Sequence, residues 1–178
     1  RATTATFETF ASRPGTEQAL EAAQSFATTP AGASILLLVG EVGTGKSHLL
    51  EAIGRACLAV GKTVRYEVVP ELLDRLRSTY RAGSDEDLHS VMEWYRRVSV
   101  LLLDDPGLEK PTAWGIEKLT MLVDERYRNG GWLALATNKP TREALGEHMG
   151  PRLADRLWDT RTGVSQVVYL TCGSYRTG

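Results

Sequence analysis

The chain lacks several features that would set it apart from ordinary globular proteins. Its 178 residues include only two cysteines, Cys57 and Cys172, which lie far apart and without the spacing of metal ligands. The simplest interpretation is that both are small apolar side chains in a reducing cytoplasm. There is also no internal repeat and no low-complexity tract, so repeat architectures and disordered linkers do not dominate the sequence.

Long apolar runs and a surplus of charge are missing as well. No run approaches the length that a bilayer requires, and no signal-peptide pattern is present, so we expect a cytoplasmic protein. The formal net charge of −1 argues against a generally basic surface for DNA. Any contact with nucleic acid would have to come from a local patch, or from several copies acting together. Because the sequence begins with Arg1 rather than Met, we expect a fragment that lacks an upstream partner-binding region.

What the sequence does contain is an alternation of apolar runs and amphipathic segments, typical of an α/β fold with a mostly parallel sheet. The apolar runs predict five strands, at residues 35–39, 63–69, 98–103, 132–136 and 166–170. Helical patterns fill the intervals, at residues 16–28, 48–60, 71–81, 85–97, 112–128 and as a pair between 141 and 159.

The interval between the second and third strands is long enough for two helices, one more than a parallel crossover needs. Residues 82–84 separate these helices, and we expect Asp85 to cap the second one. Residues 1–15 are interpreted as a linker that leads into a single domain at 16–178. A chain with 42% hydrophobic and 24% charged residues can bury a substantial core in such a domain.

The most specific motif is G-x-x-x-x-G-K-[ST] at residues 40–47, between a predicted strand and a predicted helix. A tight glycine turn and a helix start together aim several backbone N–H groups at one point, which suits the β-phosphate of a nucleotide. Lys46 would reach the β- and γ-phosphates, and the Ser47 hydroxyl would bind Mg²⁺. The residues expected to hold the nucleotide are Gly40, Val42, Gly43, Thr44, Gly45, Lys46, Ser47 and His48.

A second acidic motif follows the third predicted strand. The apolar residues 101–103 lead into Asp104 and Asp105, the arrangement known as Walker B. A carboxylate at the carboxyl end of a strand beside the P-loop faces the crevice that holds the phosphates. We expect Asp104 to hold Mg²⁺ through water and Asp105 to orient or deprotonate the attacking water. Asp105 is shorter than the commoner Glu, so the water would sit differently or the backbone would shift.

The fourth predicted strand ends in a polar amide, Asn138. In ATPases of this topology that place positions the γ-phosphate or the attacking water, and we expect Asn138 to do so. Residues 138–141 also resemble the guanine-reading Asn-Lys-x-Asp pattern of GTPases. Position 141 is Thr rather than the required Asp, so guanine specificity is rejected.

Taken together, these motifs resemble those of the AAA+ ATPases, and within them the bacterial helicase-loader family that includes DnaC, DnaI and the transposition helper IstB. The similarity covers nearly the whole chain: a linker at 6–10, the start of a helical insertion at 71–77, Walker B and its loop at 103–112, a helix at 124–127, sensor 1 at 137–138, an arginine-finger box at 152–157 and a closing motif at 173–176. The resemblance implies an AAA+ core with an extra helical insertion and no separate C-terminal lid domain.

The resemblance also implies that Arg156 is an arginine finger that reaches the ATP of a neighbouring subunit, with Arg152 as the second choice. An arginine at such a place stabilises charge on the transferring phosphoryl group. A site that is completed only between subunits requires head-to-tail assembly into a ring or an open helix. The plain alternative for both arginines is a solvated helix face with i,i+4 spacing.

By the same resemblance, the insertion at about 71–97 is where initiator-type AAA+ proteins line a DNA channel. Basic residues gather there, and acidic ones oppose them: Lys62, Arg65, Arg75, Arg77 and Arg81 against Asp85, Glu86 and Asp87. Single-stranded DNA binding rests mostly on charge and stacking, which a spiral of subunits would repeat along the strand. Tyr80, Trp94 and Tyr95 could stack on bases, although aromatic residues on helices more often belong to the core.

Four functions remain open on the sequence alone. The first is a helicase loader that binds single-stranded DNA and delivers a replicative helicase, and the second is an IstB-like helper of a transposase. The third, a small-molecule P-loop kinase, requires an Arg-rich lid that the sequence does not show. The fourth is a nucleotide-gated adaptor with little hydrolysis, which Asp105 in place of Glu keeps open. Arg176 either contacts the nucleotide as a sensor or only closes the fold.

Overall fold

The computed structural model describes residues 4–28, 32–80, 87–105 and 109–175. In chain order, the elements are α1 (Glu17–Thr28), β1 (Ile35–Gly40), α2 (Lys46–Ala59), β2 (Val64–Val68), α3 (Val69–Ser78), α4 (Leu88–Arg97), β3 (Val100–Asp104), α5 (Ala113–Asn129), β4 (Trp132–Thr137), α6 (Arg142–Met149), α7 (Pro151–Leu157) and β5 (Ser165–Leu170). Of the described helices, none is both long and apolar enough to cross a bilayer.

The strands form one parallel sheet in the order β2-β3-β4-β1-β5. β1 and β3 are therefore separated only by β4, and all three end at the same edge of the sheet. Residues that follow these strands meet in the crevice outside their carboxyl ends, which is where α/β sheets bind ligands. The strand order therefore brings the ends of β1, β3 and β4 together, although they lie far apart in the sequence.

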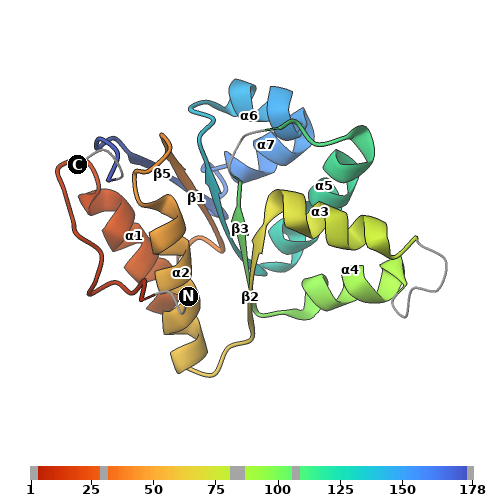
Figure 1. Ribbon diagram of the computed structural model, residues 1–178, viewed down its shortest axis with the longest axis horizontal. Helices are drawn as coiled ribbons and strands as arrows, with labels where there is room; N and C mark the ends of the chain where they lie inside the picture. Colours follow the sequence, from red (N-terminus) through yellow and green to blue (C-terminus); the bar gives the residue numbers. More distant parts are fainter. Residues whose placement is uncertain (1–3, 29–31, 81–86, 106–108, 176–178) are drawn as a thin grey trace.

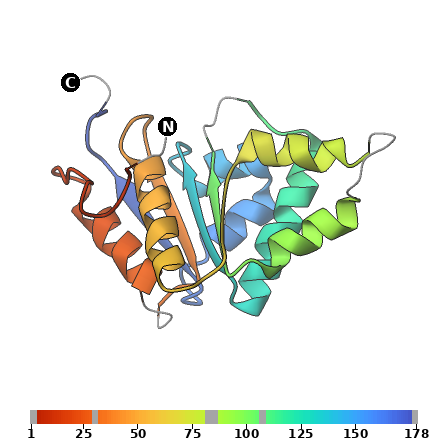
Figure 2. The ribbon, with the colours of Figure 1, turned by 60° about the horizontal axis from the view of Figure 1, so that its bottom comes forward.

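The sheet lies between two layers of helices (Figures 1 and 2). α1 and α2 cover one face, where they bury alternate strand residues such as Leu36, Leu38 and Leu102. α3 to α7 cover the other face, where they bury the strand residues that alternate with these, such as Leu37 and Leu103. Because successive strand residues point to opposite faces, a change of one position moves a side chain from one helical layer to the other.

The five predicted strands and the predicted helices are confirmed, with bounds that shift by one to three residues. α3 begins at Val69 because Pro70 suits the first turn of a helix, where no amide hydrogen bond is lost. The expectation that Asp85 caps α4 is wrong. The cap is Asp87, whose side chain accepts a hydrogen bond from the Ser90 amide at 3.0 Å. Asp85 itself lies outside the described residues.

Both ends of the described chain pack beside the P-loop. Phe10 lies within the interval interpreted as a linker, yet only 7% of its surface is exposed and it belongs to the core under α1 and α2. The other end follows β5 back to the same place, where the Tyr175 amide donates to the Gly43 carbonyl at 2.8 Å. Within residues 4–175, no separate lid domain follows the sheet.

Candidate nucleotide-binding site

The loop between β1 and α2 has the backbone that phosphate binding requires. Gly43 and Gly45 have φ angles of +83° and +96°, in a region that other residues rarely adopt. A Cβ on Gly45 would come within 2.8 Å of the Phe10 ring, so this position excludes larger residues for reasons of space as well. The loop then turns directly into α2, whose first amides are available to an anion.

Lys46 closes this loop. Only 8% of Lys46 is exposed, and its Nζ donates to the carbonyl oxygens of Gly40 and Glu41, at 2.7 Å each. The ammonium is therefore held inside the concave side of the loop, where the phosphates of a nucleotide would lie. Thr44 supports the same turn, since its hydroxyl donates to the Glu41 carbonyl at 2.9 Å.

Ser47 and Asp104 meet across the sheet edge, although 57 residues separate them. The Ser47 hydroxyl donates to Asp104 Oδ2 at 2.6 Å, and the Tyr66 hydroxyl donates to the same oxygen at 2.7 Å. Burial, and after it the hydrogen bond to Asp104, raises the pKa of Tyr66 above its ordinary value, so the phenol stays a donor at neutral pH. Hydroxyl and carboxylate oxygens are the ligands that Mg²⁺ prefers, so this pair fits the predicted metal site.

Asp105 lies on the other face of the sheet, as the alternation of strand residues requires. It is 4% exposed, and Thr137 Oγ1 donates to its Oδ2 at 3.2 Å. His148 of α6 approaches from the same side, with its Nε2 3.4 Å from Asp105 Oδ1. The two neighbouring acids therefore have different surroundings: Asp104 faces the P-loop helix, and Asp105 faces α6.

Asn138 follows β4, the strand between the P-loop strand and the Walker B strand. Its Oδ1 is buried and has no hydrogen-bond partner among the described residues. Buried polar atoms in native proteins are nearly always paired, so an orphaned oxygen at this edge fits a residue that awaits a ligand or water. This position agrees with the role predicted for Asn138.

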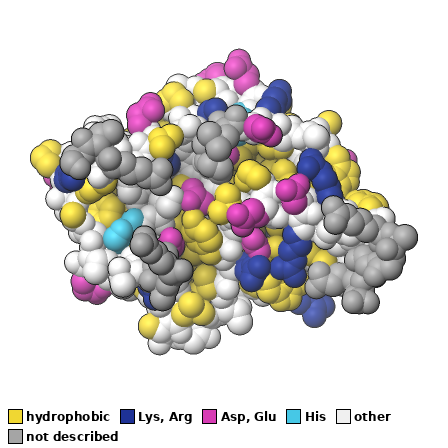
Figure 3. Space-filling view, viewed as in Figure 1, with side chains coloured by type: hydrophobic (Ala, Val, Ile, Leu, Met, Phe, Trp, Pro, Cys, Tyr) yellow, Lys and Arg dark blue, Asp and Glu magenta, His cyan; other side chains and the backbone are white. Residues whose placement is uncertain are grey.

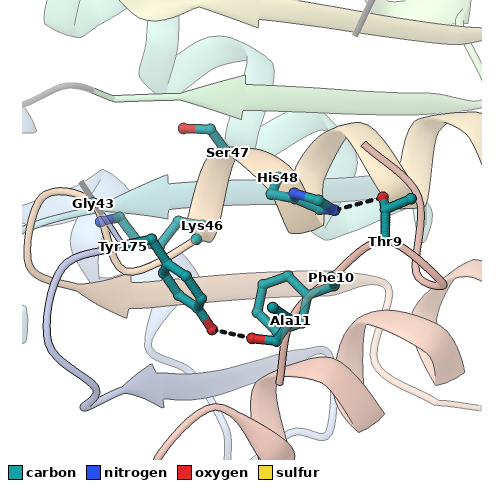
Figure 4. A pocket seen from close by; sticks show the side chains of 9 residues that line it. Thr9, Phe10, Ala11, Gly43, Lys46, Ser47, His48 and Tyr175 are labelled. Carbon is teal, nitrogen blue, oxygen red and sulfur yellow. Dashed lines mark hydrogen bonds between the residues drawn. The ribbon is translucent and has the colours of Figure 1, made fainter. Parts of the chain in front are cut away.

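Beside the P-loop lies a pocket of about 290 Å³, close to the lower end of ligand pockets in general. Figure 4 shows its two walls, with the Phe10 and Tyr175 rings on one side and the side chains of α2 on the other. Tyr175 donates to the Ala11 carbonyl at 2.5 Å, which joins the two ends of the described chain across the pocket. The ring centroids of Phe10 and Tyr175 are 6.1 Å apart. Two aromatic rings beside a phosphate loop suit the flat base of a nucleotide.

Two residues predicted to hold the nucleotide are placed less centrally. His48 lines the pocket, but its Nε2 lies 2.9 Å from the Thr6 carbonyl and 3.4 Å from Thr9 Oγ1. Val42 is 55% exposed at the tip of the loop. Sequence reasoning missed Phe10, Tyr175 and Tyr66. Phe10 had been placed in the linker and Tyr175 in the closing motif, neither as a pocket residue, and nothing local marked Tyr66.

Arg156, the predicted finger, lies on α7 and on the face of the sheet opposite to α2. Its Nε donates to Asp124 Oδ1 of α5 at 3.0 Å. Arg152 binds the other oxygen of the same carboxylate, with NH2 2.5 Å from Oδ2. The two arginines therefore share one carboxylate of α5, a partner that was not predicted. Arg176 lies outside the described residues.

The basic side chains around the insertion are largely paired. Arg65 binds Glu67 at 2.5 Å and Arg77 binds Asp74 at 3.2 Å. Figure 3 shows the same mixture, with Lys and Arg interleaved with Asp and Glu over β2, α3 and α4. Tyr95 is fully buried and belongs to the core, whereas Tyr80 and Trp94 are 64% and 41% exposed. Arg81, Asp85 and Glu86 lie outside the described residues.

Comparisons with known proteins agree with this geometry. A family model described as IstB-like ATP binding protein matches residues 5–178. The replicative helicase loader DnaC of Buchnera aphidicola is 28% identical over 126 residues, which are 68% of this chain and 51% of that protein. An ATP-binding protein in an insertion sequence of Mycobacterium tuberculosis is 29% identical over 146 residues, or 82% of this chain and 57% of that relative.

A solved structure shares the fold. The replication initiator DnaA bound to AMPPCP and single-stranded DNA superimposes with a TM-score of 0.78 at 20% identity, covering 95% of this chain and 50% of that one. The AAA+ core predicted from the sequence is therefore confirmed. The chain spans about half the length of the relatives that it matches.

Proposed function

This chain belongs to the family of IstB-like ATP-binding proteins, and from that premise we propose that it is a Mg²⁺-dependent AAA+ ATPase with an active site shared between subunits. The contact between Ser47 and Asp104 carries the proposal. The two oxygen atoms, from residues 57 positions apart, lie 2.6 Å from each other beside a loop whose glycines have positive φ angles. A metal–nucleotide complex requires such an arrangement.

Each predicted residue has a role in the proposed reaction. Lys46 and the loop amides bind the phosphates, while Ser47 and Asp104 hold Mg²⁺, which when bound neutralises charge on the β- and γ-phosphate oxygens. Asn138 positions the γ-phosphate or the attacking water, and Asp105 orients that water from the end of β3.

Arg156 would complete the site in a neighbouring subunit. It lies on the face of the sheet opposite to the subunit's own P-loop helix, which supports action on another subunit's nucleotide. Head-to-tail assembly then follows, because the P-loop surface of one copy meets the α7 surface of the next.

We propose single-stranded DNA as the substrate track and a replicative helicase as the delivered partner. The likeness to the DnaC helicase loader and to a DnaA structure with single-stranded DNA supports this role. The second candidate is a transposition helper whose partner is a transposase. The family model over residues 5–178 and the relative in an insertion sequence favour this candidate.

The test combines turnover with partner capture. Phosphate release is measured with and without EDTA and single-stranded DNA, and Ser47→Ala serves as the variant that loses one Mg²⁺ ligand. The tagged chain is then mixed with purified replicative helicase or transposase, and the partner that it retains in an ATP-dependent way identifies the role. Tight ATP binding without turnover in any mixture would favour the adaptor, and phosphorylation of a metabolite would favour the kinase.

A further inference from the structure

We infer that Asp124 is a positioning residue for the arginine finger: with the ring of Tyr127, it orients Arg156 toward the nucleotide of the neighbouring subunit. The inference rests on the proposed function and adds to it the group that aims the finger. Both residues belong to α5, whereas Arg156 belongs to α7, so the arrangement exists only in the folded protein.

Asp124 and Tyr127 hold Arg156 by its inner part. Asp124 is 4% exposed, and its Oδ1 accepts from Nε, the nitrogen nearest the aliphatic stem. The guanidinium carbon lies 4.5 Å from the centroid of the Tyr127 ring, which fixes the plane of the group. The ion pair with Asp124 is made through Nε, and the side chain remains 35% exposed. This exposure leaves the side chain open to phosphate oxygens, which a guanidinium fork can bind.

The surroundings fix this arrangement further. The backbone carbonyl of Arg156 accepts from the Ser165 hydroxyl at 2.7 Å, which ties the residue to β5. The Tyr127 hydroxyl donates to Asp159 Oδ2 at 2.6 Å, which holds the ring in place. Backbone, Nε and guanidinium plane are thus all constrained, as expected of a group that must act at a defined place.

Arg152 differs in the way that it contacts the same carboxylate. A terminal nitrogen, NH2, lies 2.5 Å from Asp124 Oδ2, so part of its fork is already engaged. Its side chain is also more exposed, at 63% against 35%. The geometry points to Arg156 as the finger, and to Arg152 as a second cation that neutralises the buried carboxylate.

A buried, ionised Asp124 is not what a purely structural contact between α5 and α7 requires. Burial raises the pKa of Asp124, but the guanidiniums of Arg156 and Arg152 lower it by more, so the group is ionised at neutral pH. Apolar residues often join two helices at less cost than a buried ion pair. An ionised group at this place therefore suits a task that only a charge performs, namely holding an arginine.

The experiment must separate aiming from simple stabilisation, and subunit mixing does so. Lys46→Ala subunits cannot use ATP but still supply a finger, so they serve as finger donors. Arg156→Ala subunits bind ATP but lack a finger, so they serve as nucleotide holders. We expect each variant alone to be nearly inactive and their mixture to regain turnover at the interfaces between holder and donor.

Asp124→Asn is then placed in one subunit type at a time. In the donor, we expect kcat of the mixture to fall about 100-fold, the effect of a small misplacement of a catalytic group, with KM for ATP unchanged. In the holder, which has no finger to aim, we expect no change. Asp155→Asn in the donor is the matched control, since it removes the α6–α7 ion pair with Arg142 next to the finger without touching Arg156.

Equal losses in both placements would mean that Asp124 only stabilises the subunit, and no loss in either would mean that it does not aim the finger; both results overturn the inference. If Asp124→Asn does not fold, Tyr127→Leu and Tyr127→Phe in the donor decide. We expect the first to lower kcat strongly and the second, which keeps the ring and loses only the hydroxyl bond to Asp159, to lower it much less; equal values would contradict the inference. A mixture without turnover beside an active wild type contradicts the shared site itself, and with it the inference.

Discussion

The two faces of the sheet carry the two halves of the proposed active site, and they are built in different ways. On the α2 face, the nucleotide-holding residues lie within one short loop and its helix, and Asp104 joins them from the adjacent strand end. On the α7 face, the proposed finger Arg156 contacts a carboxylate 32 residues away in sequence. In the proposed account, the binding half lies within one subunit and is centred on a short sequence motif, whereas the proposed finger acts on the nucleotide of another subunit.

The α7 face also contains a second kind of arginine. Arg126 is 3% exposed and donates to three backbone carbonyls, those of Trp132, Tyr95 and Val98, at 2.7 to 2.9 Å. Burial lowers its pKa to about 10, so it is still charged at neutral pH. Both terminal nitrogens of Arg126 are therefore bound within its own subunit, although its buried Nε has no partner among the described residues, whereas Arg156 is bound to Asp124 through Nε and stays 35% exposed. Substitutions can test this contrast between the faces.

The largest effect is expected on the α2 face. Lys46→Ala should abolish ATP binding and turnover, because the ammonium inside the loop is lost, while the thermal unfolding midpoint stays near that of the wild type. Binding is measured by titration with a fluorescent ATP analogue. Lys62→Ala, in the segment between α2 and β2, is the matched control and should bind normally. Normal ATP affinity in Lys46→Ala would refute the assignment of the loop.

Arg156→Ala should give the next largest effect, and on turnover alone. Arginine fingers contribute about 10³- to 10⁵-fold to kcat, so stimulated hydrolysis should fall by that order while ATP affinity is preserved. Arg152→Ala removes one of the two other guanidiniums on Asp124, the second being that of Arg128, and should cost far less. Steady-state phosphate release at fixed subunit concentration measures both. If Arg152→Ala were the more damaging of the two, the fingers would have to be reassigned.

Arg126→Leu should affect stability rather than chemistry. It leaves three buried carbonyls without their charged donor, and we expect about 3 kcal/mol of destabilisation in urea unfolding. Arg128 lies two residues away, and its side chain is 64% exposed although it contacts Asp124. Arg128→Ala is therefore the matched control and should change the free energy of unfolding by less than about 0.5 kcal/mol. Similar values for the two variants would show that the buried arginine does not hold α4, α5 and β4 together.

The smallest effect is a dependence on pH. The pKa of Asp124 is lower in the folded state than the ordinary value of about 3.9. Its contacts therefore stabilise the fold above that value and are lost as the pH falls through the native pKa. The difference in unfolding free energy between wild type and Asp124→Asn, about 1–3 kcal/mol, should stay constant from about pH 8 to pH 5 and decline below. A difference that grows on acidification would contradict this sign.

The sequence predicts the α2 face better than the α7 face for a physical reason. Phosphate binding requires fixed residue types at fixed spacing, so residues 40–47 can be recognised from the sequence alone. Apolar runs likewise indicate the strands that position them. The opposite orientations of Asp104 and Asp105 also follow from strand alternation. These properties are local, so one sequence suffices to find them.

Contacts between residues far apart in the sequence have no comparable sequence pattern. Residues 124–127 were predicted as part of a helix, but nothing in them indicated the partner of Asp124, because only the packing of α5 against α7 brings Arg156 to it. Phe10 and Tyr175 come from opposite ends of the chain and meet because β5 runs beside β1. The capping residue of α4 was misplaced by two positions because several acids precede that helix and each could serve as a cap.

The central claim is that one subunit holds the nucleotide and the next one completes the site, and the ATPase rate per subunit against protein concentration tests it most directly. The rate should climb with concentration and with single-stranded DNA in the wild type, and it should remain low at all concentrations in Arg156→Ala. A rate that is flat in concentration, indifferent to DNA and equal in both proteins would contradict the account.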